Sequence, residues 1–187
     1  MTDRSFLQWP FFGNDHRTWA GQVEEVAKGL SVDNSNIDFA CQELVKTLGK
    51  TGILHPTASK NGIFDVRKLC LTREVLSRYN GLADFSFAMQ GLGTGAITLF
   101  GSDEQKTYWL PKTQKGQVIS AFALTEPGSG SDVANSTMTA KADGNEFVLN
   151  GEKTWISNGG IADIYTVFAR TGEGLGSQGL SAFLVTP

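Results

Sequence analysis

The sequence has few of the residues from which metal sites and disulfide frameworks are built. Only two cysteines and two histidines occur among its 187 residues. Cys41 and Cys70 fall on apolar positions of segments with helical periodicity, so we expect both to be reduced thiols packed in a core. His16 and His55 are too far apart in the pattern to suggest a zinc pair. We therefore expect no metal site, and we interpret His55, which precedes Pro56, as a solvated loop residue.

An excess of one charge and long apolar runs are also missing. The chain carries 16 Lys and Arg against 19 Asp and Glu, which gives no electrostatic case for binding nucleic acid or an anionic membrane. Its apolar runs, such as 96–100 and 121–124, fall far short of the roughly 20 residues that cross a bilayer. The stretch 1–17 lacks a signal or transit pattern. We expect a cytoplasmic protein that binds neither nucleic acid nor membrane.

Several common catalytic motifs are absent as well. No lysine follows a glycine-rich turn in the Walker A pattern, and no GxGxxG follows a predicted strand. Neither histidine lies near a nucleophile-elbow pattern, which argues against a hydrolytic triad. The chemistry must be sought in other motifs.

The first two thirds of the chain follow a helical period. Apolar residues recur every three or four positions from 36 to 48, and the pattern stops at two glycines. A capping residue, Asp65, precedes another such segment, and Ser102 with Gln105 forms a capping box before a third. The expected helices span 16–30, 36–48, 66–79, 83–100 and 103–109.

Near residue 118 the period changes from 3.6 to two. The expected strands span 118–125, 137–142, 146–149, 153–157, 165–170 and 180–185. The separators Asp143-Gly144-Asn145 and Asn150-Gly151 predict hairpin turns. We predict an α+β fold: an N-terminal helical bundle over 1–117, followed over 118–187 by an incomplete antiparallel β-barrel or sandwich. The last strand runs into Pro187 with no closing element.

Two segments carry most of the chemical information. In the first, 122–132, Pro127, Gly128 and Gly130 force a tight loop with backbone amides and two serine hydroxyls that could hold a phosphate or a polar ring edge. A surface loop that only connects two strands would have the same composition. In the second, 150–160, a strand would place Trp155 and Ser157 on one face, an arrangement that suits a planar heterocycle. Ordinary core packing of the tryptophan is the alternative.

Together these segments resemble the acyl-CoA dehydrogenase family. The match consists of TEPGSGSD at 125–132, TMTA at 137–140, LNGEKTWISNGGIAD at 149–163 and YTVFAR at 165–170, with GSDEQK at 101–106 and WLP at 109–111 upstream. It covers most of 83–187, and the earlier helices fit only by pattern. Phe122 stands where tyrosine is common in the family, and Ser157 where threonine is common.

The resemblance implies an FAD-dependent oxidoreductase that introduces an α,β double bond into an acyl-CoA thioester in fatty acid metabolism. It implies a homotetramer with an electron-transferring flavoprotein as electron acceptor. FAD would lie between the β domain and a C-terminal helical domain that these 187 residues do not contain. The family's catalytic glutamate belongs to that domain, so we expect no catalytic residue here and an inactive chain when it is alone.

The implied site residues lie in the two segments. Thr125 would face the pyrimidine edge of the flavin, Ser131 the CoA side of the substrate, and Trp155 the isoalloxazine, with Ser157 near its reactive nitrogen. The implied cofactor-binding set is Phe122, Leu124, Thr125, Gly130, Ser131, Trp155, Ile156 and Ser157. Ser131 is also the implied substrate-binding residue.

Several readings stay open at this stage. An acyl-CoA oxidase, a flavin monooxygenase relative or a non-catalytic partner subunit would share the scaffold. Glu126 precedes a proline in the first loop, and we assign it a structural role, so that Glu126→Gln would perturb the loop without removing a proton-abstraction step. Gly91, Gly93 and Gly95 in the helix over 83–100 either open an acyl pocket or allow close helix packing.

Overall fold

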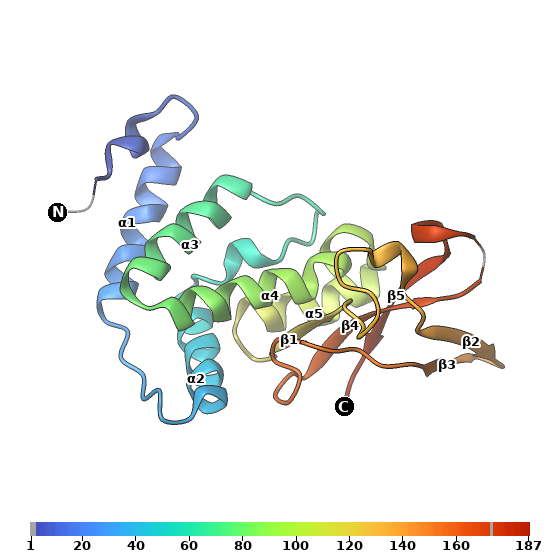
Figure 1. The fold of residues 1–187 in the computed structure, drawn as a ribbon. Coiled ribbons are helices and arrows are strands. Elements are labelled where there is room, and N and C mark those ends of the chain that lie inside the picture. The colour runs from blue at the N-terminus through green and yellow to red at the C-terminus, as the bar shows by residue number, and fades with distance from the viewer. Residues whose placement is uncertain (1–2, 173) are drawn as a thin grey trace.

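The structure is a computed structural model that describes residues 3–172 and 174–187 (Figure 1). Its α-helices are α1 (Asn14–Lys28), α2 (Ile37–Lys50), α3 (Val66–Tyr79), α4 (Gly81–Phe100) and α5 (Asp103–Gln114). Its strands are β1 (Ser120–Ala123), β2 (Thr139–Asp143), β3 (Glu146–Asn150), β4 (Ile164–Arg170) and β5 (Leu180–Val185). The helices precede the strands, as predicted.

Side-chain caps begin the helices where the sequence indicates them. Asp65 accepts a hydrogen bond from the Lys68 amide, and Ser102 and Gln105 cap each other reciprocally. Asn80 accepts from the Ala83 amide, so the pair at 80–81 joins α3 directly to α4. The last helix continues five residues past its predicted end at 109, to Gln114. Pro111 inside it removes only one backbone donor, and the Lys115 amide still bonds to the Pro111 carbonyl.

The strands form one open, mixed sheet in the order β1-β4-β2-β3, with β5 also paired to β4. The predicted α+β class and the unclosed sheet are confirmed, but the expectation of antiparallel pairing throughout is wrong. β1 pairs with β4 in parallel, and β2 meets β4 in parallel at a single pair of residues. The β2–β3 hairpin lies within the connection from β1 to β4, which supplies the crossover that parallel strands require.

Of the two predicted hairpin turns, one is confirmed and the other is wrong. The turn at 144–145 joins β2 to β3, with Gly144 at φ +62°. No hairpin forms at 150–151, because residues 153–157 are not a strand. Trp155 and Asn158 have φ values of +56° and +63°, outside the extended region.

The core joins the helices to the sheet through α4. This helix contacts α2, α3, α5, β1 and β4, and Figure 1 shows it running between the first helices and the sheet. Ile119, Ala121 and Ala162 pack in the same cluster as the buried leucines of α2. The boundary at 117 stays a prediction. Cys41 is buried, but Cys70 is exposed on α3, so its predicted core position is wrong. Of the helices that the structure describes, none is both long and apolar enough to span a bilayer.

Gln90 fixes α4 to the sheet. Its fully buried amide donates to the Val118 carbonyl at 2.7 Å and accepts from the Ser120 amide at 2.9 Å, as a neighbouring strand would. Gly93 allows the close approach, since a Cβ there would lie 2.5 Å from the Ser120 Oγ. Thr166 adds a hydrogen bond to the Gly93 carbonyl at 2.7 Å.

Gln90→Leu should lower the free energy of unfolding by about 2–5 kcal/mol, because it leaves the buried Val118 carbonyl and Ser120 amide without their Gln90 partner. The same change at Gln22, an exposed position of α1, should have an effect within about 0.5 kcal/mol. Urea unfolding followed by circular dichroism measures both. Equal stability of the two variants would show that the side-chain pairing does not hold β1 against α4.

Candidate functional site: an exposed tryptophan turn and an apolar cavity

The two motif segments are tied together just beyond the end of β1. The Lys153 ammonium lies 2.8 Å from Glu126 Oε1 and donates to the Leu124 carbonyl at 2.9 Å. The Thr154 amide donates to the Thr125 carbonyl at 3.0 Å. Both charged side chains are almost completely buried, at 8% and 3% exposure. A buried ion pair with further hydrogen bonds on each partner fixes the relative position of the loops that carry it.

The carboxylate of Glu126 is held by more than the lysine. It accepts from the Thr137 amide at 2.6 Å, the Met138 amide at 3.0 Å and the Thr137 hydroxyl at 2.9 Å. Burial by itself raises the pKa of this carboxyl, but hydrogen bonds from Lys153 and the two amides outweigh it and lower the pKa to about 2. Glu126 is therefore a firmly ionised structural anchor.

Arg170 holds the far end of the same loop. Its guanidinium donates to the carbonyls of Ser136, at 2.6 Å, of Gly176, at 3.0 Å, and of Ala134. Near the loop's turn the Ser129 hydroxyl is turned inward to the Asp132 carbonyl. Gly130 and Ser131 remain exposed at the surface. The loop thus has fixed ends and a tip that faces solvent.

The segment after Lys153 displays its tryptophan. Trp155 is 91% exposed, which excludes the core packing considered for it. Its φ of +56° is unusual for a bulky residue and costs about 1–2 kcal/mol. The side chain of its neighbour Ile156 packs against the core. A strained backbone that presents a large aromatic ring to solvent is typical of a ligand-binding position.

The other predicted site residues are distributed along these two segments. Phe122, Leu124, Thr125 and Ser157 are half-buried. Backbone hydrogen bonding brings Thr125 next to Thr154, and thus the first segment next to the one that carries Trp155. Phe122 lies on β1, apart from Thr125 and Thr154, and its ring centroid is 5.1 Å from that of Phe168. The shared strand face expected for Trp155 and Ser157 does not exist, because the segment is a turn.

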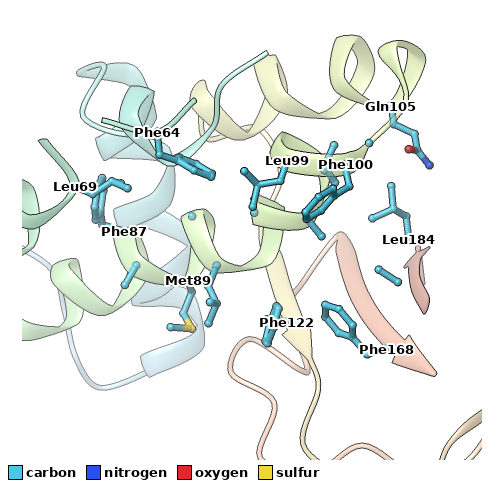
Figure 2. Close-up of a pocket in the computed structure, with 18 of the residues that line it drawn as sticks. Phe64, Leu69, Phe87, Met89, Leu99, Phe100, Gln105, Phe122, Phe168 and Leu184 are labelled. Carbon is cyan, nitrogen blue, oxygen red and sulfur yellow. The ribbon is translucent and has the colours of Figure 1, made fainter. Parts of the chain in front are cut away.

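An apolar cavity of about 860 Å³ lies between α4 and the sheet (Figure 2). Figure 2 shows Leu99 and Phe100 on the helix side and Phe122 and Phe168 on the sheet side. The one ionisable side chain among the described lining residues, Arg73, is paired with Asp84 at 2.8 Å and 3.0 Å.

Glycines of α4 contribute to this cavity. Gly91 and Gly95 line it, and a Cβ at Gly95 would meet nothing within 4 Å. Gly93 instead permits close packing against β1. Gly91 and Gly95 thus line open space beside α4, whereas Gly93 allows α4 to pack closely against β1. That the open space holds an acyl group stays a prediction.

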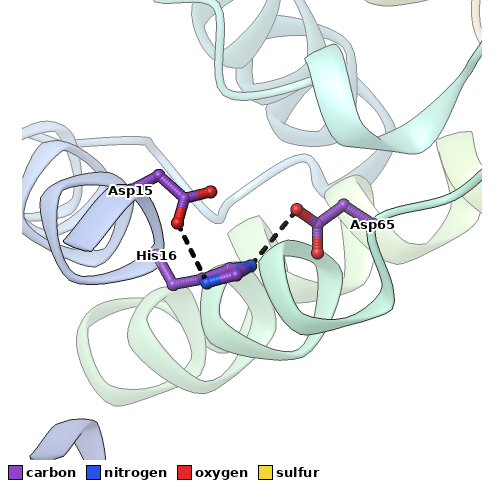
Figure 3. A group of neighbouring side chains, drawn as sticks. All are labelled: Asp15, His16 and Asp65. Carbon is purple, nitrogen blue, oxygen red and sulfur yellow. Dashed lines mark ion pairs between the residues drawn. The ribbon is translucent and has the colours of Figure 1, made fainter. Parts of the chain in front are cut away.

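A separate polar cluster joins α1 to the start of α3. His16 is buried between Asp15 and Asp65, whose carboxylates lie 3.2 Å and 3.3 Å from its two ring nitrogens (Figure 3). The Gly13 amide donates to Nδ1, which assigns the ring proton to Nε2. Although Asp15, His16 and Asp65 could hold a metal ion, the Lys68 ammonium, 3.7 Å and 3.9 Å from the carboxylates, already supplies a cation there.

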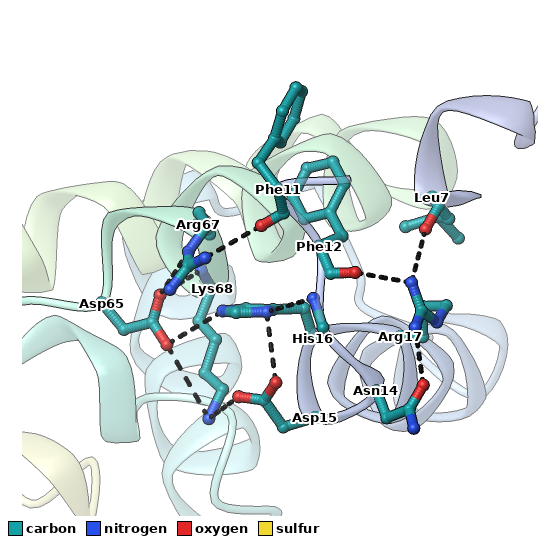
Figure 4. A network of polar contacts seen from close by, with 11 residues as sticks. Leu7, Phe11, Phe12, Asn14, Asp15, His16, Arg17, Asp65, Arg67 and Lys68 are labelled. Atoms are coloured by element: carbon teal, nitrogen blue, oxygen red, sulfur yellow. Dashed lines mark hydrogen bonds and ion pairs between the residues drawn. The ribbon is translucent and has the colours of Figure 1, made fainter. Parts of the chain in front are cut away.

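This cluster anchors the N-terminal segment. Arg67 donates to the Phe11 carbonyl, and Arg17 donates to the carbonyls of Leu7 and Phe12 (Figure 4). We interpret the network as structural. His55 is exposed, in agreement with its prediction as a solvated loop residue.

Sequence reasoning assigned no role to Lys153, Asn158, Phe168 or Arg170. A signal for Lys153 existed: Glu126 is the one charged residue within 116–131, and Lys153 is the one charged residue within 153–162. Two lone opposite charges in two linked motifs suggest a pair. The contacts of Arg170 are all with backbone carbonyls, which leave no signal in a sequence.

Comparisons with known proteins agree on one family. The family model for the N-terminal domain of acyl-CoA dehydrogenases matches residues 17–117, and the model for the middle domain matches 121–187. An acyl-CoA dehydrogenase from Bacillus subtilis (strain 168) is 36% identical over 166 residues, which are 87% of this chain and 44% of that protein.

Solved structures of similar fold include a member of the same family. An acyl-CoA dehydrogenase from Bacillus anthracis, complexed with FAD, has a TM-score of 0.78 at 32% identity. The match covers 100% of this chain and 35% of that protein's chain. An electron transferring flavoprotein of Acidaminococcus fermentans has a TM-score of 0.83 at 29% identity, and the match covers 96% of this chain and 50% of that protein's chain. The chain thus spans half or less of the length of these proteins.

The low pKa of Glu126 predicts an acid-sensitive loop. Because the folded-state pKa, about 2, lies below the ordinary value of 4.5, the carboxylate's contribution is complete above about pH 5 and is lost as pH falls toward 2. Glu126→Gln should remove this dependence and lower the free energy of unfolding at pH 7 by about 3 kcal/mol. Urea unfolding between pH 3 and 7 measures it, with Glu146→Gln, an exposed carboxyl, as control. Parallel pH profiles for wild type and Glu126→Gln would contradict the assignment.

Proposed function

Because this chain belongs to the acyl-CoA dehydrogenase family, we propose that it forms the N-terminal and middle regions of an FAD-dependent acyl-CoA dehydrogenase. The reaction is the introduction of an α,β double bond into an acyl-CoA thioester. One observation carries the proposal: Trp155 is 91% exposed and strained, at the end of a segment anchored by a buried ion pair. Such a ring suits a flat partner that covers it.

The residues around Trp155 fit the isoalloxazine ring of FAD. The indole offers an aromatic face, the hydroxyls of Thr125 and Ser157 offer hydrogen bonds to polar ring edges, and Gly130 leaves open space at the exposed tip of the first loop. Leu124 supplies an apolar side chain next to Thr125, Ile156 offers its backbone amide and carbonyl, and Phe122 lies farther away at the cavity. When bound, the flavin supplies the electron-pair acceptor that side chains lack.

The apolar cavity fits the acyl group of the substrate. Its wall is formed by aliphatic and aromatic side chains, and the Arg73 guanidinium is already paired. Burial of methylene groups there contributes about 0.8 kcal/mol each. Phe122, between the cavity and the first loop, would separate acyl chain from flavin, and Ser131, exposed at the loop tip, would face the CoA portion.

Proton abstraction is assigned to a group outside these 187 residues. A carboxyl with a pKa of about 2 that is also enclosed by three donor residues is a poor general base, which argues against Glu126. We expect Glu126→Gln to leave exchange of the substrate α proton in place. An electron-transferring flavoprotein as electron acceptor stays a prediction, because a similar fold does not identify a binding partner. A homotetrameric state, a cytoplasmic location and a role in fatty acid metabolism stay predictions.

FAD binding by this chain should depend on Trp155. Without a second wall the binding should be weak, and titration of the isotope-labelled chain with FAD should shift the Trp155 indole NMR signal in fast exchange. Trp155→Ala should weaken binding about 5- to 150-fold, because stacking of a base on an aromatic ring is worth about 1–3 kcal/mol. Trp9→Ala, at another exposed tryptophan, is the control. Absence of any FAD-dependent shift in the wild type would sink the proposal.

Filling the cavity should weaken acyl binding selectively. Gly95→Leu places a side chain into open space and should reduce affinity for a long-chain acyl-CoA about tenfold, as expected for excluding roughly two methylene groups. Gly21→Leu, which also meets nothing within 4 Å but lies on α1, should bind like wild type. Isothermal titration calorimetry measures both. Unchanged affinity in Gly95→Leu would place the acyl group elsewhere.

A further inference from the structure

We infer that Lys153 and Asn158 are positioning residues that hold Trp155 in its exposed, left-handed conformation. The inference rests on the proposed function in that the presented ring is the flavin contact. It goes further in assigning the ring's placement to two residues whose side chains bond to the protein itself, Lys153 to Leu124 and Glu126 and Asn158 to Ser120. Neither is a catalytic residue.

A left-handed tryptophan needs a cause in its surroundings. Non-glycine residues with positive φ persist only where neighbouring interactions over-determine the backbone. Trp155, at φ +56°, and Asn158, at φ +63°, are the two such residues in the described chain. They lie three positions apart, within one short turn, so one set of contacts has to account for both.

The turn is fastened to β1 at both of its ends. Before Trp155, the Lys153 ammonium donates to the Leu124 carbonyl and pairs with Glu126, while the Thr154 amide donates to the Thr125 carbonyl. After it, the Asn158 side-chain amide donates to the Ser120 carbonyl at 3.0 Å. Ser120 is the first residue of β1 and Leu124 directly follows its last, so the turn is anchored at the start of the strand and just beyond its end.

The contacts in the middle of the turn determine that the Trp155 indole points to solvent. The Ile156 side chain packs against the core, and its carbonyl accepts the Gly159 amide at 2.9 Å. The Asn158 carbonyl accepts the amides of Ile161 and Ala162 at 3.0 Å and 2.9 Å. With both ends fixed and Ile156 directed inward, Trp155 is directed outward. Asparagine suits position 158 because it tolerates positive φ.

The ligand-free conformation gives the first test. A positive φ produces a strong NOE between a residue's own amide and α protons, which ¹⁵N-edited NMR of the 187-residue chain detects at Trp155. Lys153→Met and Asn158→Gly should each weaken this NOE severalfold. Lys153→Arg should retain it, because it keeps a cation next to Glu126. Lys141→Met, at an exposed lysine of β2, is the matched control and should behave as wild type.

FAD titration of the same variants gives the second test. If release of one anchor leaves the presenting conformation about one-tenth populated, affinity for FAD falls about tenfold. Lys153→Met can unfold the loop, because it leaves Glu126 buried without its partner. Asn158→Gly removes only one hydrogen bond, and glycine tolerates the backbone angle. If Lys153→Met is unstable, Asn158→Gly therefore decides the test.

The outcomes separate this inference from the proposed function. A retained NOE and wild-type FAD affinity in a folded Asn158→Gly chain would overturn the positioning role, while the flavin contact of Trp155 would stand. A wild-type chain with the strong NOE but no FAD-dependent shift would overturn the flavin proposal and leave the positioning of Trp155 intact. Loss of both NOE and affinity in Asn158→Gly and Lys153→Met, with rescue in Lys153→Arg, is the expected result.

Discussion

The arrangement of the candidate site depends on one buried ion pair, Glu126 with Lys153. Two loops meet there, and neither contains a strand or an α-helix; the first has only an isolated bridge between Glu126 and Ser129 and a three-residue 3-10 helix, Val133–Asn135. The pair is strong because each partner has further hydrogen bonds: Glu126 to the chain at 137–138, and Lys153 to the Leu124 carbonyl. Removing one partner would leave a buried charge uncompensated, so the loops are held in a single arrangement. The exposure of Trp155 and the position of Thr125 follow from it.

The cavity depends on a second constraint, the close approach of α4 to β1. Gly93 removes the Cβ that would collide with Ser120, and Gln90 satisfies the edge of the strand with its own amide. Since the buried side of α4 is committed to the sheet, its Gly91 and Gly95 are left to line an open apolar space. The helix therefore forms the junction between helices and sheet and, at the same time, one wall of the candidate acyl site. The glycines that allow close packing and those that line the cavity thus lie on the same helix, α4.

Much of this molecule could be predicted from its sequence, and the failures have physical causes. Helices with clear periodicity and capping residues, such as those begun by Asp65 and Ser102, were located correctly, and the family was identified from its loop motifs. The segment 153–157 alternates like a strand, yet it forms an irregular loop in which Lys153 and Thr154 donate to the Leu124 and Thr125 carbonyls, just beyond β1. Parallel pairing of β1 with β4 is equally invisible locally, because it joins residues some forty positions apart. Cys70 was misplaced because it lies on the exposed face of α3 with Arg67 and Arg73, whereas the buried face is formed by Leu71, Thr72, Val75 and Leu76.

The central claim is that the anchored turn presents Trp155 to a flavin ring. A crystal structure of the chain with bound FAD tests it most directly, since it locates the ring and the backbone of the turn together. The account predicts the isoalloxazine against the Trp155 indole, with Thr125 and Ser157 at its polar edges and the Glu126–Lys153 pair unchanged. An isoalloxazine bound away from Trp155, or a turn that relaxes to negative φ at Trp155 when FAD binds, would contradict it.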